Sequence, residues 1–461
     1  MEAFESDGLF WLPDQEEEQV AGRVTFDPAK GTRLSLIGSF SGSTFGDQDS
    51  PQFSTIHGVA GKRFLTFVGC TQSSSRFESP GFHREDYRAD FMFAGQALLG
   101  PDAMKFDRFS VRFNNLYDWV GQSSVSRQHT FDPASGKLIK AGLTLTPMQE
   151  IEYAAQDCTI SLSGVWKILG SKQKPGFEED FSIRVEYDDP VDFGCVKTDI
   201  AALQDLLTAT TDSVSVPTEI TLWTPLSDGD DDARRSYVKA YGQQTAYALV
   251  KETRPGDVLL RLGDIGGLEA VARWFDFVRS RRIILGLMLS SKYSKMYTEN
   301  KFFNAVSAAE TLHRMEFPNE VRPAGEYKNF RRMLVRYVPK NYRSWLSQQL
   351  AYSNEPRLRH RLFELAEYGG LPTVIGCDAH KWAKAVTDAR NRMVHHDKGK
   401  GPGASSAELY WLAESLKLMI LLCLAKFCEF QDGYQGKLQD AASIQFLAER
   451  VSAIMGSQTG E

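Results

Sequence analysis

The feature of this sequence that most constrains its fold is a change of pattern near residue 260. Before that point, short runs such as residues 63–68 and 106–113 alternate polar and apolar side chains, which is the period of a half-buried β-strand. After it, apolar residues recur at intervals of three and four, which is the period of an amphipathic helix. We therefore expect an α+β multidomain protein, with a β-rich region followed by an all-α region.

The β-rich region should span residues 1–262. Many short strands joined by Gly, Pro and Asp turns are typical of a barrel or a sandwich. At about 150 residues per domain, the length leaves room for two subdomains, with a break near residues 170–215. One helix, 199–207, interrupts the strands and begins with an aspartate, which is common at helix starts. Strands are expected at 23–26, 33–37, 63–68, 106–113, 159–163, 219–223 and 257–262.

The second part of the chain should be a helical connector, 263–300, followed by an all-α bundle, 301–461. Five prolines fall between the expected helices or at their starts, where proline is tolerated. They are Pro318, Pro339, Pro356, Pro372 and Pro402. The expected helices are 267–280, 301–315, 326–338, 341–352, 356–368, 378–396, 405–430 and 439–454.

The charge is unevenly distributed along the chain. The formal net charge is −6, which by itself gives no reason to expect a nucleic-acid partner. Residues 301–400, however, contain 18 Lys and Arg against 10 Asp and Glu, a net charge of +8, which leaves −14 for the remainder. A basic helical segment attached to an acidic β-region favours an anionic partner at the helical end.

Several classes of protein are disfavoured by simple patterns. The six cysteines include no Cys-x2-Cys pair and are too sparse for a disulfide scaffold, which indicates a reducing compartment and no zinc ribbon. The acidic N-terminus, MEAFESDGLFWLPDQEEEQ, lacks the pattern of a signal peptide. The most apolar run, 418–425, is far shorter than the roughly 20 residues that cross a membrane. We expect a cytoplasmic protein with no membrane contact, cofactor or metal ion.

Residues 385–397, AVTDARNRMVHHD, carry the most reactive combination of side chains. On a helical wheel the apolar residues share one side, and a carboxylate, an amide, a guanidinium and an imidazole share the other. The helix should stop after His396, because the glycines and proline that follow cannot continue it. His395 would then face the negative end of the helix dipole, which favours imidazolium. Such a group beside a phosphate suits general acid catalysis of RNA cleavage.

The ordinary interpretation of this segment is a solvated helix end, because Arg and His at this spacing also occur by chance. A second polar motif upstream adds weight to the functional one. Glu310 and Arg314 are spaced i, i+4 and can pair on one helix face. A surface ion pair is the default explanation for that spacing.

Taken together, Glu310-x3-Arg314 and Arg390-Asn391-x3-His395 resemble the motifs of the HEPN ribonuclease superfamily. Within it, the chain is most similar to the ApeA-like anti-phage defence proteins. Residues 303–313 and 389–396 resemble their helical domain, and residues 106–121, with the turn-rich strands, resemble the β-rich domain that precedes it.

The resemblance implies a metal-independent endoribonuclease that works as a homodimer through its helical domain. Arg390 would hold the scissile phosphate, His395 would act as general acid and base, and Asn391 would orient the histidine or bind phosphate. The expected products are a 2′,3′-cyclic phosphate and a 5′-OH. The supporting residues would be Glu310, Arg314, Asp388, Arg392 and His396.

The resemblance also implies a biological setting. The substrate would be tRNA or another host RNA, and its cleavage would halt growth of an infected cell by abortive infection. The β-rich region would be sensory or regulatory, binding a phage-derived trigger or restraining the nuclease.

Three alternatives stay open at this stage. Arg390 and His395 differ by 140° on an ideal helix, so Arg392 with His395 or His396 is an alternative pair. The helical region is alternatively a non-catalytic module that binds RNA or a nucleotide and dimerises, with a ligand sensor in the β-domain. A carbohydrate-related function ranks last, because aromatic residues on strands are more often core. It would rest on Tyr117, Trp119, Trp166 and Trp223.

Overall fold

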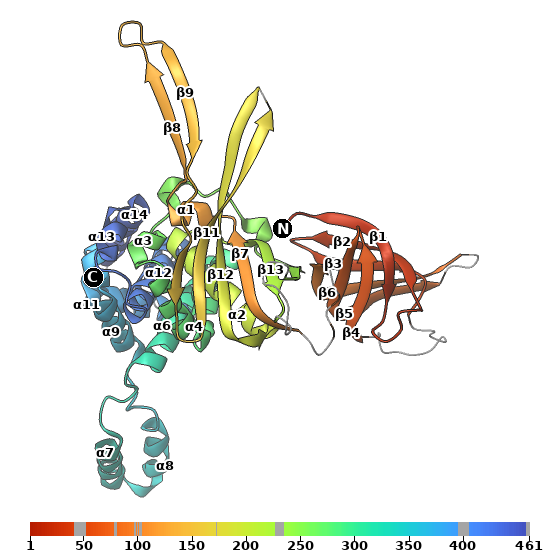
Figure 1. The fold of residues 1–461 in the computed structure, drawn as a ribbon. Coiled ribbons are helices and arrows are strands. Elements are labelled where there is room, and N and C mark those ends of the chain that lie inside the picture. The colour runs from red at the N-terminus through yellow and green to blue at the C-terminus, as the bar shows by residue number, and fades with distance from the viewer. Residues whose placement is uncertain are drawn as a thin grey trace. The chain divides into compact units, whose positions relative to one another are not determined.

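The computed structural model divides into two compact units. The first contains Met1–Arg279 and Lys292–Ser294, and the second contains Ser280–Ser291 and Lys295–Glu461. The first is β-rich and the second is helical, which confirms the predicted α+β architecture (Figure 1). Their border lies inside the range 263–300 that the sequence indicates as a connector. The structure describes residues 1–40, 52–77, 81–95, 98, 100, 104–171, 173–225, 235–394 and 405–457.

The first six strands form a closed antiparallel barrel. Their order is β6-β3-β2-β1-β4-β5, and β5 pairs again with β6 to close it. Phe10, Phe26 and Phe67 are fully buried in its core. Closure removes the unpaired edges that a small open sheet would expose. The strands are β1 (Phe4–Trp11), β2 (Val20–Asp27), β3 (Gly31–Ile37), β4 (Gln52–Ala60), β5 (Arg63–Phe77) and β6 (His83–Gly95).

The other strands of this sheet continue from the barrel as an open antiparallel sheet, because the end of β6 also pairs with β14. The order is β14-β13-β7-β12-β11-β10. The predicted break near residues 170–215 stays a prediction. The turn between β11 and β12 and the helix that follows β12 lie in this range, and the closed barrel gives way to the open sheet after Gly95. The strands are β7 (Lys105–Phe113), β10 (Ile151–Ala154), β11 (Cys158–Ser171), β12 (Lys174–Asp192), β13 (Pro217–Trp223) and β14 (Tyr237–Gly242).

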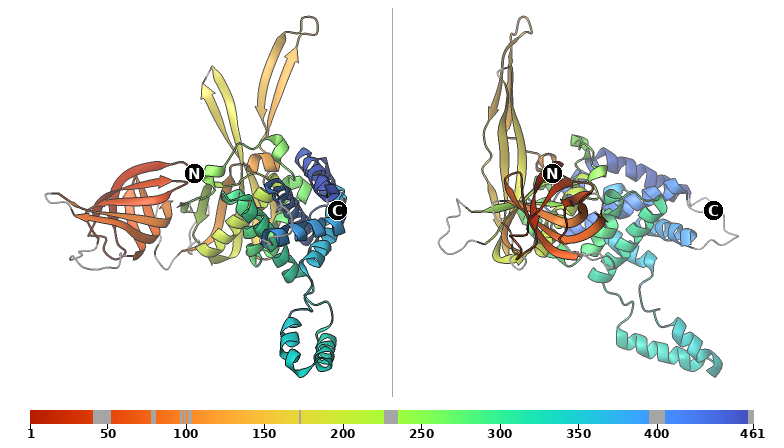
Figure 2. Two further views of the ribbon diagram at one scale, coloured as in Figure 1. Left: turned by 180° about the vertical axis from the view of Figure 1, so that it is seen from behind. Right: turned by 90° about the vertical axis from the view of Figure 1, so that its right-hand side faces the viewer.

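Two hairpins extend away from this sheet as long arms. One is the separate pair β8 (Val125–Phe131) and β9 (Leu138–Leu145), and the other is the outer part of β11 and β12 (Figures 1 and 2). Both carry exposed apolar side chains, among them Phe131, Ile139 and Ile168.

Helices pack against the open sheet. The long helix α2 (Phe193–Thr211) contacts β7, β12 and α4 (Leu268–Arg279), and the indole N–H of Trp274 donates to the carbonyl of Ala202 at 2.9 Å. The predicted strand 257–262 is wrong. The backbone N–H groups of Leu259 and Leu260 both donate to the carbonyl of Thr210, so this segment caps the C-terminus of α2. The short helices nearby are α1 (Leu116–Val120), η2 (Tyr247–Leu249), η3 (Pro255–Asp257) and α3 (Leu262–Ile265).

The helical unit contains every helix predicted after residue 300, together with three that the sequence pattern missed. The missed ones, α5, α10 and α13, include two that are short. In full, the helices are α5 (Arg282–Tyr293, which spans both units), α6 (Thr298–Glu316), α7 (Ala324–Tyr337), α8 (Lys340–Gln349), α9 (Leu358–Gly369), α10 (Leu371–Ile375), α11 (Ala379–Val394), α12 (Ser406–Phe427), α13 (Tyr434–Asp440) and α14 (Ala442–Ser457).

The helix α12 is the centre of this unit. It is buried on all sides over its middle and second half, and α6, α9, α10 and α14 contact it. The hydroxyl of Ser405 accepts from the N–H of Glu408 at 3.1 Å and caps its first turn. Because a helix that is apolar all round is stable only when it is surrounded, α12 determines where the neighbouring helices lie.

The contacts of α12 define two ends of the bundle. At its start, Glu408 accepts from Arg392 of α11 at 2.6 Å. At its end, the ring of Phe427 lies 6.4 Å from that of Phe317, which follows α6. These two positions are about 28 Å apart along the helix axis. The Trp382 indole also donates to Ser415 of α12, so α11 runs antiparallel to α12.

The first unit depends on a buried ion pair that yields a stability prediction. The guanidinium of Arg279 donates to both oxygens of the buried Asp199 at 3.0 Å, and Tyr187 donates to the same carboxylate at 2.7 Å. Replacing Arg279 with Met should lower the free energy of unfolding by about 3 kcal/mol, because it leaves a buried carboxylate without its counter-ion. Urea denaturation of the purified variant measures this loss.

The control is Glu269→Gln on the same helix. It removes an exposed i, i+4 ion pair with Arg273 and should cost less than about 1 kcal/mol. Equal stabilities of Arg279→Met and Glu269→Gln would contradict the role given to the buried pair.

Candidate functional site

The helix α11 presents the polar residues of the first motif at its C-terminal end. Val386 and Ala389 are fully buried, as the helical wheel predicts. Arg390 is half-buried and Asn391 is exposed. A guanidinium N–H of Arg390 donates to Oδ1 of Asn391 at 3.4 Å. The two side chains are therefore adjacent on the part of α11 that solvent reaches.

The two arginines of this motif have different surroundings. Arg392 donates to Glu408 at 2.6 Å, and Asp388 accepts from Lys384 at 2.7 Å, so both make ion pairs within the bundle. Within the described ranges, Arg390 has no carboxylate partner. Arg390 is the arginine of this helix whose charge is available to an anionic ligand.

The histidines of the motif, His395 and His396, lie outside the described residues. The described part of α11 ends at Val394.

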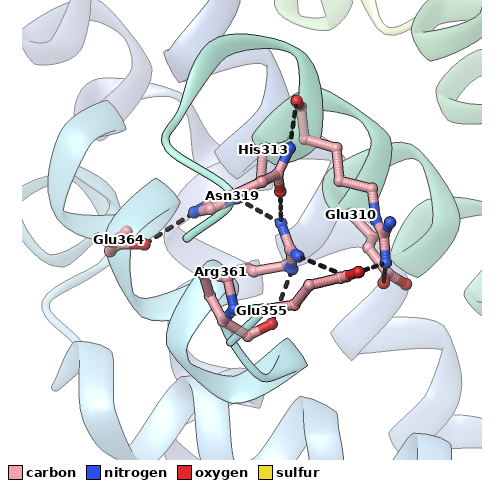
Figure 3. A network of polar contacts seen from close by, with 8 residues as sticks. Glu310, His313, Asn319, Glu355, Arg361 and Glu364 are labelled. Carbon is pink, nitrogen blue, oxygen red and sulfur yellow. Dashed lines mark hydrogen bonds and ion pairs between the residues drawn. The ribbon is translucent and has the colours of Figure 1, made fainter. Parts of the chain in front are cut away.

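The second motif forms the predicted pair. A guanidinium N–H of Arg314 lies 3.2 Å from Oε1 of Glu310, and the same group lies 3.3 Å from Glu355 (Figure 3). Arg314 is about half exposed, so the Glu310 pair alone contributes little stability. Glu355 also contacts Arg361, so it connects Arg314 to a cluster around that buried arginine.

That buried cluster, which we call the Arg361 network, consists of His313, Asn319, Glu355, Arg361 and Glu364 (Figure 3). Arg361 is 1% exposed and His313 is fully buried. The guanidinium donates to Nδ1 of His313 at 2.9 Å, to Asn319 at 2.5 Å and to the carbonyl of Pro356 at 3.0 Å. These bonds connect α6, the following turn and α9.

The contacts fix the protonation state of His313. Because a guanidinium only donates, Nδ1 accepts from Arg361, and Nε2 then donates its hydrogen to Glu364 at 2.7 Å. Burial lowers the pKa of His313, and the charge of Arg361 acts in the same direction. These two effects outweigh the hydrogen bond that His313 donates to Glu364, which raises the pKa. His313 is therefore a neutral structural histidine rather than a proton donor.

The sequence of α9 contains a pattern that indicates this network. Arg361 lies on the same helix face as Leu358, Leu362 and Leu365, which form the apolar stripe of α9. A lone cation on an apolar stripe indicates a buried, fully bonded charge.

The structure places the two motifs at different ends of the bundle. The α11 motif lies at the Glu408 end of α12. His313 stacks on Phe317 with ring centroids 5.0 Å apart, which places the Arg361 network at the Phe427 end. Among the described residues, no hydrogen bond or ion pair connects Glu310 or Arg314 with the α11 motif.

Over the ranges that the structure describes, no cluster of three or more His, Cys, Asp or Glu side chains has an arrangement able to hold a metal ion. Within the same ranges, none of the helices combines the length and apolar character that a membrane span requires. The six cysteines, all of which lie in the described ranges, form no disulfide bond with one another.

Two family models match this chain in successive segments. The model described as ApeA N-terminal domain 1 matches residues 5–274, which is more than half of the chain, and the model described as Apea-like HEPN matches residues 303–434. Both candidate motifs lie within the second segment. Comparisons with curated proteins and with solved structures gave no match.

The Arg361 network leads to a prediction for stability against pH. In the unfolded chain His313 takes up a proton near its usual pKa of about 6.5, whereas in the folded chain its pKa is lower. Its contribution should therefore reduce the free energy of unfolding as the pH falls from about 6.5 toward the folded-state pKa, and leave it constant above that range. Urea denaturation between pH 5 and 8 measures the effect.

The test compares His313→Asn with His360→Asn. His360 is an exposed histidine that contacts the same Glu364 at 3.3 Å. His313→Asn should be less stable by about 2 kcal/mol at pH 8 and should lose less further stability on acidification than the wild type. An unchanged acid dependence in His313→Asn would refute the assignment of a neutral His313.

Proposed function

We propose that this chain, which belongs to the ApeA-like HEPN family of nuclease defence proteins, is an endoribonuclease whose chemistry is carried by Arg390, Asn391 and His395. One observation carries the proposal. Arg390 lies at an accessible helix end with no carboxylate partner among the described residues, five positions before a histidine, inside the segment that matches the HEPN model.

The proposed reaction uses only these side chains. Arg390 binds a non-bridging oxygen of the scissile phosphate and offsets its negative charge. His395 removes the proton of the 2′-OH, the 2′-oxygen attacks phosphorus, and the bond from phosphorus to the 5′-oxygen breaks. A protonated imidazole then supplies a proton to the 5′-oxygen. The products are a 2′,3′-cyclic phosphate and a 5′-OH, and no metal ion takes part in the steps.

A homodimer through the helical domain would complete this chemistry. The reaction needs one base and one acid, and each chain supplies one His395. A twofold axis that brings two α11 ends together would place two imidazoles and two Arg390 guanidinium groups at one phosphate. The net charge of +8 over residues 301–400 would favour RNA at such a cleft.

The remaining residues of the predicted site receive indirect roles in this proposal. Arg392 positions α11 through its ion pair with Glu408 of α12, Asp388 pairs with Lys384 on the surface of α11 itself, and His396 is held in reserve as the alternative histidine. Glu310 and Arg314 are positioning residues of the α6–α9 end, because the bundle separates them from the α11 motif.

We further propose that the substrate is tRNA or another host RNA, that its cleavage causes abortive infection, and that the β-rich unit binds a phage-derived trigger. Two of the four aromatic residues behind the carbohydrate hypothesis have roles in packing. Trp119 is fully buried, and Tyr117 stacks on Phe181 with ring centroids 5.8 Å apart.

Substitutions on α11 test the proposal. Arg390→Ala and His395→Ala should each lower the rate of RNA cleavage at least about 10²-fold, because one removes the phosphate ligand and the other the proton carrier. Cleavage of a labelled tRNA pool by the purified dimer in EDTA, followed by end-group analysis, gives both the rate and the chemistry. Circular dichroism should show unchanged helix content.

The matched control is Lys381→Ala, which removes an exposed cation from the same helix without altering the motif. It should cleave RNA like the wild type. His396→Ala separates the two histidines, since a loss there with full activity in His395→Ala would transfer the role to His396. Full activity of both histidine variants, or RNA binding by the wild type with no product, would reject the nuclease proposal in favour of a binding module.

A further inference from the structure

A hairpin of two helices leaves the bundle between α6 and α9. It consists of α7 and α8, and Figures 1 and 2 show it apart from the other helices of its unit. Its base is closed by the N–H of Val321, which donates to the carbonyl of Asn354 at 2.8 Å, and by the N–H of Arg322, which donates to the Asn354 side chain at 3.0 Å. In the described chain, α7 and α8 pack chiefly against each other.

Polar contacts join the two helices of the hairpin, whose apolar side chains are half-buried or exposed. Arg331 donates to the carbonyl and hydroxyl of Ser347, at 2.8 and 2.7 Å, and connects the two helices. Arg343 donates to the carbonyls of Arg336 and Val338, each at 3.1 Å, and caps the end of α7. These two arginines are structural.

The outer surface of the hairpin is strongly basic. Residues 324–349 contain six Lys and Arg and a single acidic residue, Glu326. Four of the six are exposed and, among the described residues, have no carboxylate partner; they are Lys328, Arg332, Arg336 and Lys340. The first three are spaced i, i+4, i+8, so they form one stripe along α7.

Large aromatic side chains lie beside this charge. Tyr337 is 83% exposed, Trp345 is 59% exposed and Tyr342 is 55% exposed. Tyr337 follows Arg336 at the end of the stripe, and Tyr342 and Trp345 share one face of α8 at a spacing of i, i+3. Leu334 and Leu346 are half-buried, so these three rings are the more exposed part of the apolar surface of the hairpin.

Cations next to exposed aromatic rings fit a single-stranded nucleic acid. Guanidinium and ammonium groups bind phosphates, and aromatic rings stack on bases of any sequence. A membrane surface fits less well, because its binding requires an exposed aliphatic face, and the branched residues Leu334 and Val335 of α7 are half-buried, which leaves Met333 as an exposed side chain of this kind.

We propose that the α7–α8 hairpin is an RNA-holding arm. The stripe of Lys328, Arg332 and Arg336 binds successive phosphates, and Tyr337, Tyr342 and Trp345 stack on unpaired bases. This inference rests on the proposed function, because it takes RNA as the substrate. The arm leaves the bundle at the Phe427 end of α12, about 28 Å from the end that carries Arg390. It therefore acts on long RNA and has no contact with a short oligonucleotide at the cleavage site.

The experiment uses a triple variant of the full chain, Lys328→Gln, Arg332→Gln and Arg336→Gln, in the His395→Ala background so that RNA stays intact. Fluorescence anisotropy with a labelled tRNA and with a labelled unstructured 30-nucleotide RNA gives the Kd at several salt concentrations. The triple variant should bind at least about tenfold more weakly, and its slope of log K against log salt should be smaller by about 2, since each phosphate contact contributes about 0.7.

The matched control removes three exposed cations from the β-rich unit, Lys30→Gln, Arg63→Gln and Arg84→Gln. It changes the net charge equally and should leave the Kd for RNA unchanged. In the cleavage-competent protein, the triple variant should raise KM for tRNA and leave kcat, and the cleavage of a trinucleotide, unchanged. A second variant, Trp345→Ala, keeps every charge and should weaken binding of the unstructured RNA about tenfold while leaving the salt slope unchanged.

Each outcome is decisive. RNA binding by the triple variant that equals that of the control variant overturns the arm, whether or not the protein cleaves RNA. Loss of binding to anionic phospholipid vesicles without loss of RNA binding also overturns it and assigns the hairpin to a membrane. A wild type that cleaves no RNA, with binding that depends on the stripe, would reject the proposed nuclease and leave the arm in place.

Discussion

The burial of α12 on all sides is the constraint on which the helical unit depends. Its apolar residues face every direction over most of its length, so the helix is stable only when α6, α9, α10 and α14 surround it. Its length then sets the separation of the two ends of the bundle, about 28 Å. One end receives Arg392 at Glu408, and the other receives Phe317 at Phe427. Arg390 belongs to the first end and the buried Arg361 to the second.

At the Glu408 end, Arg392 holds α11 through its ion pair with Glu408, while Arg390 has no carboxylate partner within the described ranges. At the other end, Arg361 is held by His313, Asn319 and the carbonyl of Pro356, and its charge is consumed in joining α6 to α9. The two arginines illustrate one distinction. A buried guanidinium with every donor satisfied stabilises the fold, whereas an accessible one without a counter-ion is available to a ligand.

Periodicity predicted most of this architecture, because long amphipathic helices and alternating strands leave direct patterns. It failed at 257–262, where apolar residues cap α2 instead of pairing in a sheet. The spacing of Glu310 and Arg314 predicted their ion pair. It did not predict that Arg314 would also contact Glu355, because spacing within one helix contains no information about its packing partners. Arg361 was missed for the same reason, since its partners come from two other segments.

We propose that the end of α11 cuts RNA through His395 by a route that leaves a 5′-hydroxyl. The measurement that tests it most directly is sequencing of 5′-hydroxyl RNA ends in phage-infected cells that express either the wild-type chain or His395→Ala at equal levels. We expect a defined set of new 5′-hydroxyl ends with the wild type and their absence with the variant. The same set of ends in both samples would contradict it.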